Sequence, residues 1–399
     1  SQRSAMSEAK NASSTLAAAK KLSAIKRMPS LTRGLTTSDG RMAGGVMRTR
    51  STSHQSEEMS DCKKQERLSQ RVRKSLASPR AFDDGRIGSW TLSGKVGDEL
   101  KTNQDRGVVV WPFNGKSTEA LLCIFDGHGD DGEHVASFVS ARLPILLEQD
   151  GDSLRADPEG TLRKKIIEVN DDLVVGMGTK SYASTSGCTA AVVYACGDEL
   201  WVAWVGDSRV VMGTRRGGNV EVAFETDAHK GDVPSEKARV EACGGRVDTS
   251  EDPVRVWVDD LGLSMSRSIG DTKFKRRGVI ATADVQHLRL DPASKPGAEG
   301  DCLLVLASDG VWDVIESDEV CQLVGRHSKA RSACQELVTL AQERWTAEEA
   351  DYRDDTTAIV VFLPFLKVPR ASRVPKQLRT AAPSPATPRT SRTSRNSAA

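Results

Sequence analysis

One short segment places a carboxylate, a histidine and two glycines directly after an apolar run. Residues 121–125 are Leu-Leu-Cys-Ile-Phe, which predicts a buried strand, and Asp126-Gly127-His128-Gly129 follows at once. Glycine lets the main chain turn sharply and come close to a cation or a phosphate. The segment therefore predicts a metal site, although Asp-Gly alone is also typical of a plain turn.

Three further aspartates stand within four residues of an expected strand: Asp207, Asp309 and Asp354. If these strand ends meet at one rim of a sheet, the carboxylates lie close together and their repulsion calls for a cation between them. The sequence has no Cys-x-x-Cys pair. Oxygen ligands without paired cysteines favour magnesium or manganese over zinc.

The segments occur among seven short motifs in one order, at 103–105, 125–129, 186–190, 205–209, 266–271, 307–313 and 353–356. They read Asn-Gln-Asp, Phe-Asp-Gly-His-Gly, Ser-Gly-Cys-Thr-Ala, Val-Gly-Asp-Ser-Arg, Ser-Arg-Ser-Ile-Gly-Asp, Ala-Ser-Asp-Gly-Val-Trp-Asp and Arg-Asp-Asp-Thr. Each motif is weak alone, but the ordered set is specific. Residues 88 to 365 thus resemble the type 2C, metal-dependent serine/threonine protein phosphatases.

The resemblance implies an α+β fold. A central β-sandwich of two mostly antiparallel sheets is flanked by helices on both sides, in four layers, α-β-β-α. The residue pattern agrees, because β-branched apolar runs predict strands at 108–111, 121–125, 189–195, 200–205, 220–224, 302–307 and 358–363. Helical spacing appears at 133–147, 162–175 and 330–345. A segment at about 230–260 is expected as an inserted helix and loop, the flap beside the cleft in the resembling family.

The resemblance also assigns the metal ligands. Asp126 matches the carboxylate that bridges two Mg²⁺ or Mn²⁺ ions, and the Gly127 carbonyl matches a ligand of one of them. Asp309 and Asp354 match ligands of the other ion. Two remaining aspartates are assigned further metal contacts, Asp105 at the first strand and Asp207 at a weaker third ion. For Asp207 a second interpretation stays open, a hairpin in which it pairs with Arg209.

The implied reaction is attack of a water shared by the two ions on the phosphorus of phosphoserine or phosphothreonine. His128 would protonate the departing alcohol oxygen. Three residues would not bind the ions themselves but would orient the metal ligands or their waters: Gln104, Asp271 and Asp313. Many relatives hold the substrate phosphate with a basic residue where this chain has Leu100, so the neighbouring Lys101 is the candidate for that contact.

Charge divides the chain into three parts. The total is +1, but residues 1–85 carry +9 and residues 367–399 carry +8, which leaves −16 for residues 86–366. We expect a catalytic domain at 86–366 between two basic, disordered extensions rich in Ser, Ala and Thr. The tails contain only Phe82 as an aromatic residue, which argues against specific nucleic-acid stacking.

The sequence therefore predicts a monomeric phosphatase that acts on phosphoproteins. Three alternatives stay open: a pseudophosphatase that binds phosphoproteins without turnover, a phosphomonoesterase of non-protein substrates, and an adaptor that works through its tails. No apolar run is long enough to span a membrane. Scattered cysteines in apolar runs indicate a reducing compartment, the cytoplasm or nucleus, with an organellar transit peptide at residues 5–28 as the alternative.

Overall fold

The structure is a computed structural model that describes residues 85–176, 182–250, 253–291 and 297–366. The expected tails at 1–85 and 367–399 lie outside the described residues, apart from Gly85. The candidate transit peptide and the basic charge of both ends fall in the same segments. The described residues all belong to one unit of the chain.

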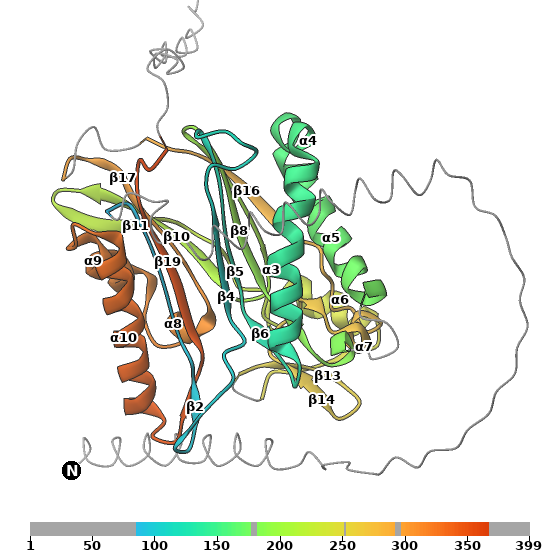
Figure 1. Cartoon of the computed structure of the whole chain (residues 1–399). Coiled ribbons are helices and arrows are strands. Elements are labelled where there is room, and N and C mark those ends of the chain that lie inside the picture. Colours follow the sequence, from blue (N-terminus) through green and yellow to red (C-terminus); the bar gives the residue numbers. More distant parts are fainter. Residues whose placement is uncertain (1–84, 177–181, 251–252, 292–296, 367–399) are drawn as a thin grey trace, which may run out of the picture. The chain divides into compact units, whose positions relative to one another are not determined.

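Two five-stranded sheets form the centre of this unit (Figure 1). The first sheet has the order β1 (Ile87–Leu92), β19 (Thr356–Phe362), β17 (Gly300–Ala307), β10 (Arg209–Arg216) and β11 (Asn219–Glu225). The second has the order β16 (Asp284–Arg289), β9 (Glu199–Val205), β8 (Ala190–Cys196), β5 (Glu119–Phe125) and β4 (Arg106–Val110). Every strand pair within these two sheets is antiparallel.

Helices cover the outer face of each sheet (Figure 1). The second sheet packs against α3 (Gly132–Gln149), α4 (Gly151–Ala156) and α5 (Pro158–Gly176). The first packs against α8 (Asp309–Trp312), α9 (Ser317–Gly325) and α10 (Ala330–Glu348). A third apolar layer lies between the two sheets. The four-layer α-β-β-α fold expected from the sequence is confirmed.

The strand β5 shows why its sequence is apolar without alternation. Leu121 belongs to the layer beneath α3, and Leu122 belongs to the layer between the sheets. Successive side chains of a strand point to opposite faces, so a strand covered on both faces needs apolar residues at every position. All seven residues of β5 are buried. This rigid strand carries Asp126 and His128 at its end.

Two small sheets lie where the large strands end. One joins β6 (Gly127–His128), β7 (Gly187–Cys188) and β15 (Ile269–Gly270). The other joins β2 (Lys95–Val96), β3 (Glu99–Leu100) and β18 (Tyr352–Arg353). These pairings bring His128 next to the 266–271 motif and bring Lys101 next to the 353–356 motif.

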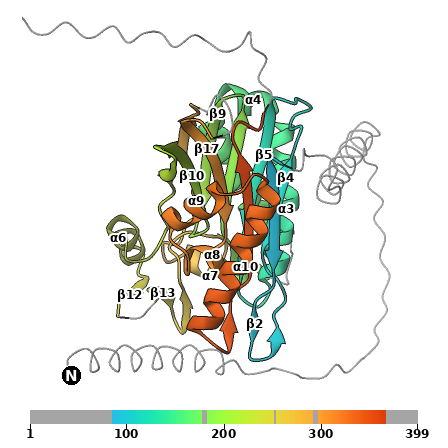
Figure 2. The same cartoon turned by 90° about the vertical axis from the view of Figure 1, so that its left-hand side faces the viewer.

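The flap has more regular structure than the sequence predicts. Its helix, α6 (Pro234–Ala242), is confirmed, and Gly244 with a φ of 75° follows where the helix was expected to stop. The expected loop is instead a three-stranded sheet of β12 (Arg246–Asp248), β13 (Arg255–Val258) and β14 (Leu261–Leu263), so that part of the prediction is wrong. The sheet forms because the flap has its own apolar core around Val240 and Val256. Figure 2 shows α6, β12 and β13 to one side of the sandwich.

Three strands of the large sheets were not predicted from the sequence: β1, β10 and β16. Each of them mixes polar and apolar residues, and β1 and β16 are edge strands of their sheets.

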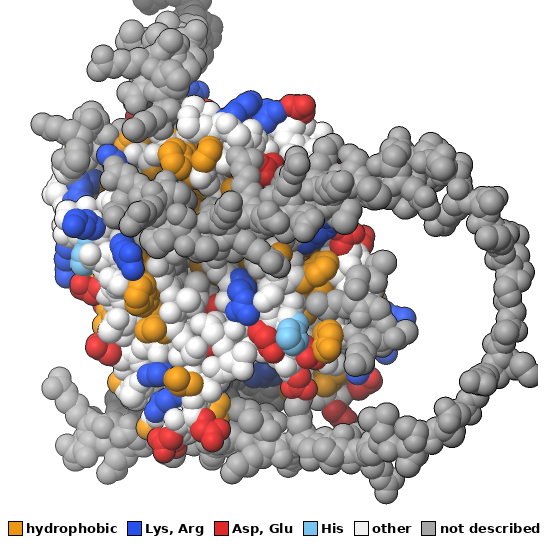
Figure 3. Space-filling view, in the orientation of Figure 1, with side chains coloured by type: hydrophobic (Ala, Val, Ile, Leu, Met, Phe, Trp, Pro, Cys, Tyr) orange, Lys and Arg blue, Asp and Glu red, His pale blue; other side chains and the backbone are white. Residues whose placement is uncertain are grey.

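None of the described helices is long and apolar enough to cross a membrane. On the face seen in Figure 3, acidic and basic side chains are interspersed.

Candidate active site

The strand register places four predicted metal-site aspartates at one end of the sandwich. Asp105 precedes β4 and Asp126 follows β5, and these two strands pair with Arg106 opposite Phe125. In the other sheet, Asp309 follows β17 and Asp354 precedes β19, with Ala307 opposite Ala358. The strand ends meet as expected, because Asp126 lies close enough to Asp309, Asp105 and Asp354 to feel their charges, but they belong to two sheets and not to the rim of one.

The carboxylates are buried or partly buried, and they act on one another electrostatically. Burial raises the pKa of Asp126 well above its usual range, and the charges of Asp309 and Asp105 add to the effect. Burial likewise raises the pKa of Asp309, with Asp313 and Asp207 adding to it. The pKa of Asp105 rises to about 6, first through burial. Like charges held this close are typical of a cation site.

Hydroxyl groups fix the orientation of two of these aspartates. Ser308 Oγ donates a hydrogen bond to Asp105 Oδ2 at 2.8 Å. Thr189 Oγ1 accepts the backbone N–H of Asp126 at 3.0 Å, and the Thr189 N–H donates to the Asp126 carbonyl at 2.8 Å. Ser308 thus holds the carboxylate of Asp105, whereas Thr189 holds the main chain of Asp126.

Two lysines lie among the carboxylates. Lys101 Nζ contacts Asp354 Oδ1 at 2.7 Å, and Lys230 Nζ forms an ion pair with Asp207. Burial opposes the charge of each lysine, yet Asp354 raises the pKa of Lys101 and Asp207 raises that of Lys230. The hairpin interpretation, in which Asp207 pairs with an arginine, is wrong. Arg209 instead contacts Glu225 at 3.2 Å.

His128 is held by Asp271, at 2.7 Å between Nε2 and Oδ2. Burial alone would lower the pKa of His128, but Asp271 outweighs it and the pKa is raised. Asp271 is fully buried and has a left-handed backbone conformation, with φ 49° and ψ 49°, at the start of α7 (Thr272–Lys275). Lys275 lies behind this pair and donates to the Ser268 carbonyl at 2.6 Å, and burial lowers the pKa of Lys275 to about 8.

The remaining predicted residues also lie at this end. Gln104 Nε2 donates to the Gly129 carbonyl at 2.9 Å and to Glu133 Oε2 at 3.1 Å. Only glycine fits at position 127, since a Cβ there would lie 2.5 Å from the Gly132 carbonyl oxygen. Asp313 ends α8, and its backbone N–H donates to the carbonyl of residue 309.

The donor set fits hard divalent cations. Within the described residues, no three His, Cys, Asp or Glu side chains already enclose a point that could hold a metal ion. However, Asp105 Oδ1 and Asp207 Oδ1 are buried without a hydrogen-bond partner, which is costly for a carboxylate oxygen. Mutually repelling carboxylates with unpaired oxygens are the donors that Mg²⁺ and Mn²⁺ prefer.

A family model described as protein phosphatase 2C matches residues 92–350 of this chain. The chain belongs to the protein phosphatase 2C family. It is therefore a protein serine/threonine phosphatase, as the ordered motifs implied.

Plant proteins are among the relatives of this phosphatase. Probable protein phosphatase 2C 64 of Oryza sativa subsp. japonica is 35% identical over 294 residues, which cover 70% of this chain and 66% of that protein. Probable protein phosphatase 2C 72 of Arabidopsis thaliana is 35% identical over 282 residues, which cover 65% of this chain and 81% of that protein. A serine-threonine phosphatase 2C from Toxoplasma gondii has the same fold, with a TM-score of 0.59 and 21% identity, covering 71% of this chain and 96% of that one.

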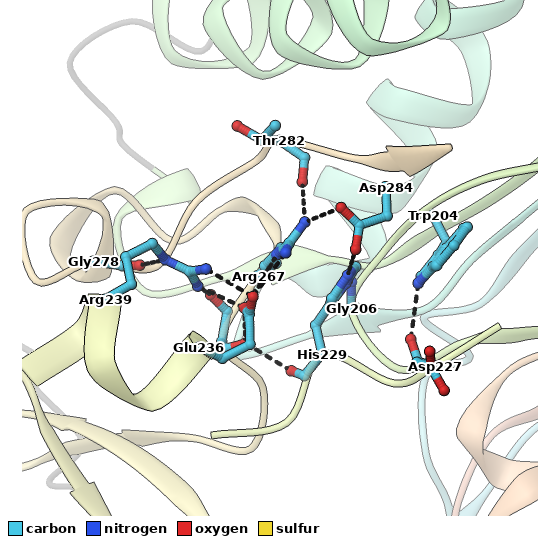
Figure 4. Close-up of polar contacts among 11 residues, drawn as sticks. Trp204, Gly206, Asp227, His229, Glu236, Arg239, Arg267, Gly278, Thr282 and Asp284 are labelled. Atoms are coloured by element: carbon cyan, nitrogen blue, oxygen red, sulfur yellow. Dashed lines mark hydrogen bonds and ion pairs between the residues drawn. The ribbon is translucent and has the colours of Figure 1, made fainter. Parts of the chain in front are cut away.

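The flap of the phosphatase is tied to the site by a polar network (Figure 4). Glu236 of α6 accepts from Arg239 at 2.7 Å and from Arg267 at 2.7 Å. Arg267 also donates to Asp284 at 2.8 Å, and Asp284 contacts His229 Nε2 at 3.2 Å. His229 Nδ1 then accepts the backbone N–H of Gly206 at 3.0 Å. The network thus connects the flap helix to the residue before Asp207.

Sequence reasoning missed several residues that complete the site: Ser308, Thr189, Lys230, Lys275 and Glu133. Ser308 and Thr189 stand inside two of the seven motifs, so the motifs carried a signal for both. Lys230 follows His229 in a polar stretch without periodicity, and its contact with Asp207 joins segments 23 residues apart. Only the three-dimensional structure shows such a pairing.

Proposed function

We propose that this protein phosphatase hydrolyses phosphoserine and phosphothreonine monoesters at a centre that holds two Mg²⁺ or Mn²⁺ ions. The observation that carries the proposal is the group of buried and partly buried aspartates, Asp105, Asp126 and Asp309, whose pKa values are raised by desolvation and by neighbouring carboxylates. Asp126 and the Gly127 carbonyl would hold one ion, and Asp126, Asp309 and Asp354 the other. Bound ions supply a water of lowered pKa and neutralise the phosphate charge.

His128 is proposed as the general acid for the departing serine or threonine oxygen. Its Nε2 contacts Asp271, while Nδ1 is buried without a hydrogen-bond partner. Nδ1 is therefore the unpaired ring nitrogen, which the bound substrate must expose before it can give a proton to the alcohol oxygen. The raised pKa of His128 keeps that proton on the ring near neutral pH.

Lys101 is proposed to contact a phosphate oxygen. Its ammonium group reaches Asp354, so it already points into the group of carboxylates. A point charge at this place suits a phosphate, and Asp354 is free to bind a cation once Lys101 turns to the substrate. Gln104 and Asp105 support the same end of the site.

Asp207 is proposed as a ligand of a weaker third ion, with Asp309 or Asp313 nearby. In the structure Lys230 neutralises Asp207, so a cation there must compete with an ammonium group. This competition gives a physical reason for weak binding at the third site. Asp271, Asp313 and Gln104 act on the ligands and on His128 rather than on the substrate.

We further infer that the phosphatase acts as a monomer on phosphoproteins in the cytoplasm or nucleus. The seven described cysteines are all unpaired, which fits a reducing compartment. Neither the pseudophosphatase alternative nor the adaptor alternative gains support from the family match or from the geometry.

The proposal is tested with the full chain on a phosphothreonine peptide and on an aryl phosphate. Manganese or magnesium should activate both reactions and a chelator should abolish them. Asp126→Asn should lose more than about 100-fold in kcat/KM, because changes merely behind metal ligands already cost 10- to 100-fold. Asp198→Asn, in the turn between β8 and β9 at the opposite strand ends, is the control. Activity that ignores the chelator or survives Asp126→Asn would refute the two-ion centre.

A further inference from the structure

A groove of about 840 Å³ lies on the outer side of the first sheet, next to α10. Its walls come from β1, from the β3 hairpin, from β18 and from the exposed face of α10, which places Thr339 and Thr346 along it. This volume is in the range of sites that hold ligands or side chains of a partner. None of the residues proposed for catalysis lines it.

The groove presents mainly apolar atoms, and several of its polar side chains are already paired. Asn103 donates to Thr91 Oγ1 at 2.9 Å. Gln342 donates to Thr356 Oγ1 at 2.7 Å, and Thr346 Oγ1 donates to the Gln342 carbonyl at 2.9 Å. What these residues offer an occupant is therefore methyl and methylene surface.

Leu100 gives the groove an unburied apolar wall. Its exposed fraction of 71% is the largest among the exposed large hydrophobic residues of the described chain, and Val96 of the same hairpin is also exposed. A single exposed leucine needs no explanation. Leu100 differs because it borders a concave, largely apolar surface that an apolar side chain can fill.

The groove borders chain segments that carry residues of the catalytic site. Three of its lining residues directly precede site residues: Leu100 before Lys101, Asn103 before Gln104, and Arg353 before Asp354. The 2.7 Å contact between Lys101 and Asp354 joins two of these segments. An extended chain advances about 3.3–3.6 Å per residue, so residues close to a bound phosphoresidue can reach the groove.

We infer that this groove is a substrate subsite for an aliphatic side chain within about four residues of the phosphoresidue, a distance set by the reach of an extended chain. The inference rests on the proposed function, because it assumes that a phosphoprotein segment binds at Asp126. Glu343 and Arg353 also line the groove and have opposite charges, so we expect it to select for apolar character and not for net charge.

The test uses full-length protein with manganese and a set of phosphothreonine peptides of Ser and Ala. In each peptide one flanking residue, from four before to four after the phosphothreonine, is replaced by Leu. At one position on one side, Leu should raise kcat/KM about 10-fold through a lower KM, as expected for burying most of a leucine side chain.

Two variants fill the groove, Thr346→Trp and Thr339→Trp. For each variant, kcat/KM on the preferred Leu peptide divided by kcat/KM on the peptide with Ser at that position should fall to near one. The ratio is measured within one variant, so a partial loss of folded protein does not mimic it, and the second variant serves if the first does not fold. Ser332→Trp, exposed on the same helix but outside the groove, should keep the preference.

The outcomes separate the two proposals. Failure to hydrolyse any peptide or aryl phosphate would refute the proposed function itself. Hydrolysis without a position-specific preference for Leu, or a preference that survives both groove-filling variants, would overturn the subsite alone. A groove-filling variant that speeds all peptides equally would also overturn it, in favour of a segment of this chain as occupant. A shift from dimer to monomer in the variants would point instead to a second copy.

Discussion

His128 depends on Asp271, which is fully buried. The 2.7 Å contact fixes the ring through Nε2 and leaves Nδ1 to act. The strained left-handed conformation of Asp271 is stabilised by its backbone N–H, which donates to the Ser186 carbonyl at 3.0 Å. Asp271 is therefore a positioning residue, and its effect should depend on how much the leaving group needs a proton.

We predict that Asp271→Asn lowers kcat on a phosphothreonine peptide by about 10- to 100-fold. An aryl phosphate should lose far less, because an aryl oxygen leaves without protonation. His128→Ala should show the same selectivity, and the double variant should be no worse than His128→Ala alone. Steady-state kinetics on both substrates measure this, and an equal loss on both would mean that Asp271 serves only the fold.

Lys101 has two tasks that a substitution separates. If it binds phosphate, Lys101→Met should raise KM about 10- to 100-fold, because a hydrogen bond to a charged group contributes that much to binding. Lys101→Arg should then retain most of the affinity for the phosphate. If it merely neutralises Asp354, Lys101→Met should leave KM unchanged and tighten manganese binding. Inhibition by inorganic phosphate gives an independent measure of the same contact.

At the scale of single residues, the sequence predicted which aspartates belong to the candidate site, and His128 with them, because their motifs have fixed residue types and spacing. It did not predict that lysines pair with Asp354 and Asp207, since such contacts depend on side chains from distant segments. Gln104 shows a related limit. Its amide was expected to support the metal ligands, yet its nitrogen donates to Glu133, a residue that no motif marked.

The flap is the element whose stability depends most clearly on charge. Although burial raises it, the pKa of Glu236 is lowered to about 2 because Arg239, Arg267 and Ser266 hold the carboxylate. A group with a lowered folded pKa stabilises fully above its unfolded pKa, and that stability is lost as the pH falls through the folded pKa. The window here runs from about 4.5 down to about 2.

We predict that Glu236→Gln lowers the free energy of unfolding by about 3 kcal/mol at pH 7, because two arginines lose their buried partner. The difference from the unmodified chain should shrink as the pH is lowered from about 4.5 towards 2. Urea unfolding at several pH values measures this. Glu241→Gln, at an exposed pair of the same helix, should show little change. A difference that is constant with pH would contradict the role of Glu236.

Elements were predictable where the apolar pattern was strong. The strand at 121–125 and the helices at 133–147 and 330–345 occur in the structure with slightly wider bounds. Strands β1 and β16 were missed because an edge strand needs only part of its residues to be apolar. The flap sheet was missed because its strands are three or four residues long and depend on packing against Val240.

The catalytic domain as a whole combines a stable sandwich with a strained centre. The clustered carboxylates raise one another's pKa, so without cations they oppose folding. Removing one of them should therefore stabilise the metal-free protein even as it removes activity, a trade-off common at functional sites.

We predict that manganese raises the thermal midpoint of the unmodified chain by several degrees, since a ligand at 100 times its dissociation constant adds about 2.7 kcal/mol. In a chelator, Asp126→Asn should unfold at a higher temperature than the unmodified chain, and manganese should raise its midpoint much less. Scanning calorimetry with and without metal measures both effects. A lower midpoint for metal-free Asp126→Asn would mean that repulsion is not significant at this site.

Calorimetric titration with manganese tests the central claim most directly, because it counts ions without relying on activity. The full chain should bind two ions tightly, with a weaker third at higher concentration. Asp126→Asn should lose at least one of the two tight sites, whereas the control Asp198→Asn should retain both. Equal stoichiometry in Asp126→Asn and the unmodified chain, or no tight binding in either, would contradict a two-ion centre built on Asp126.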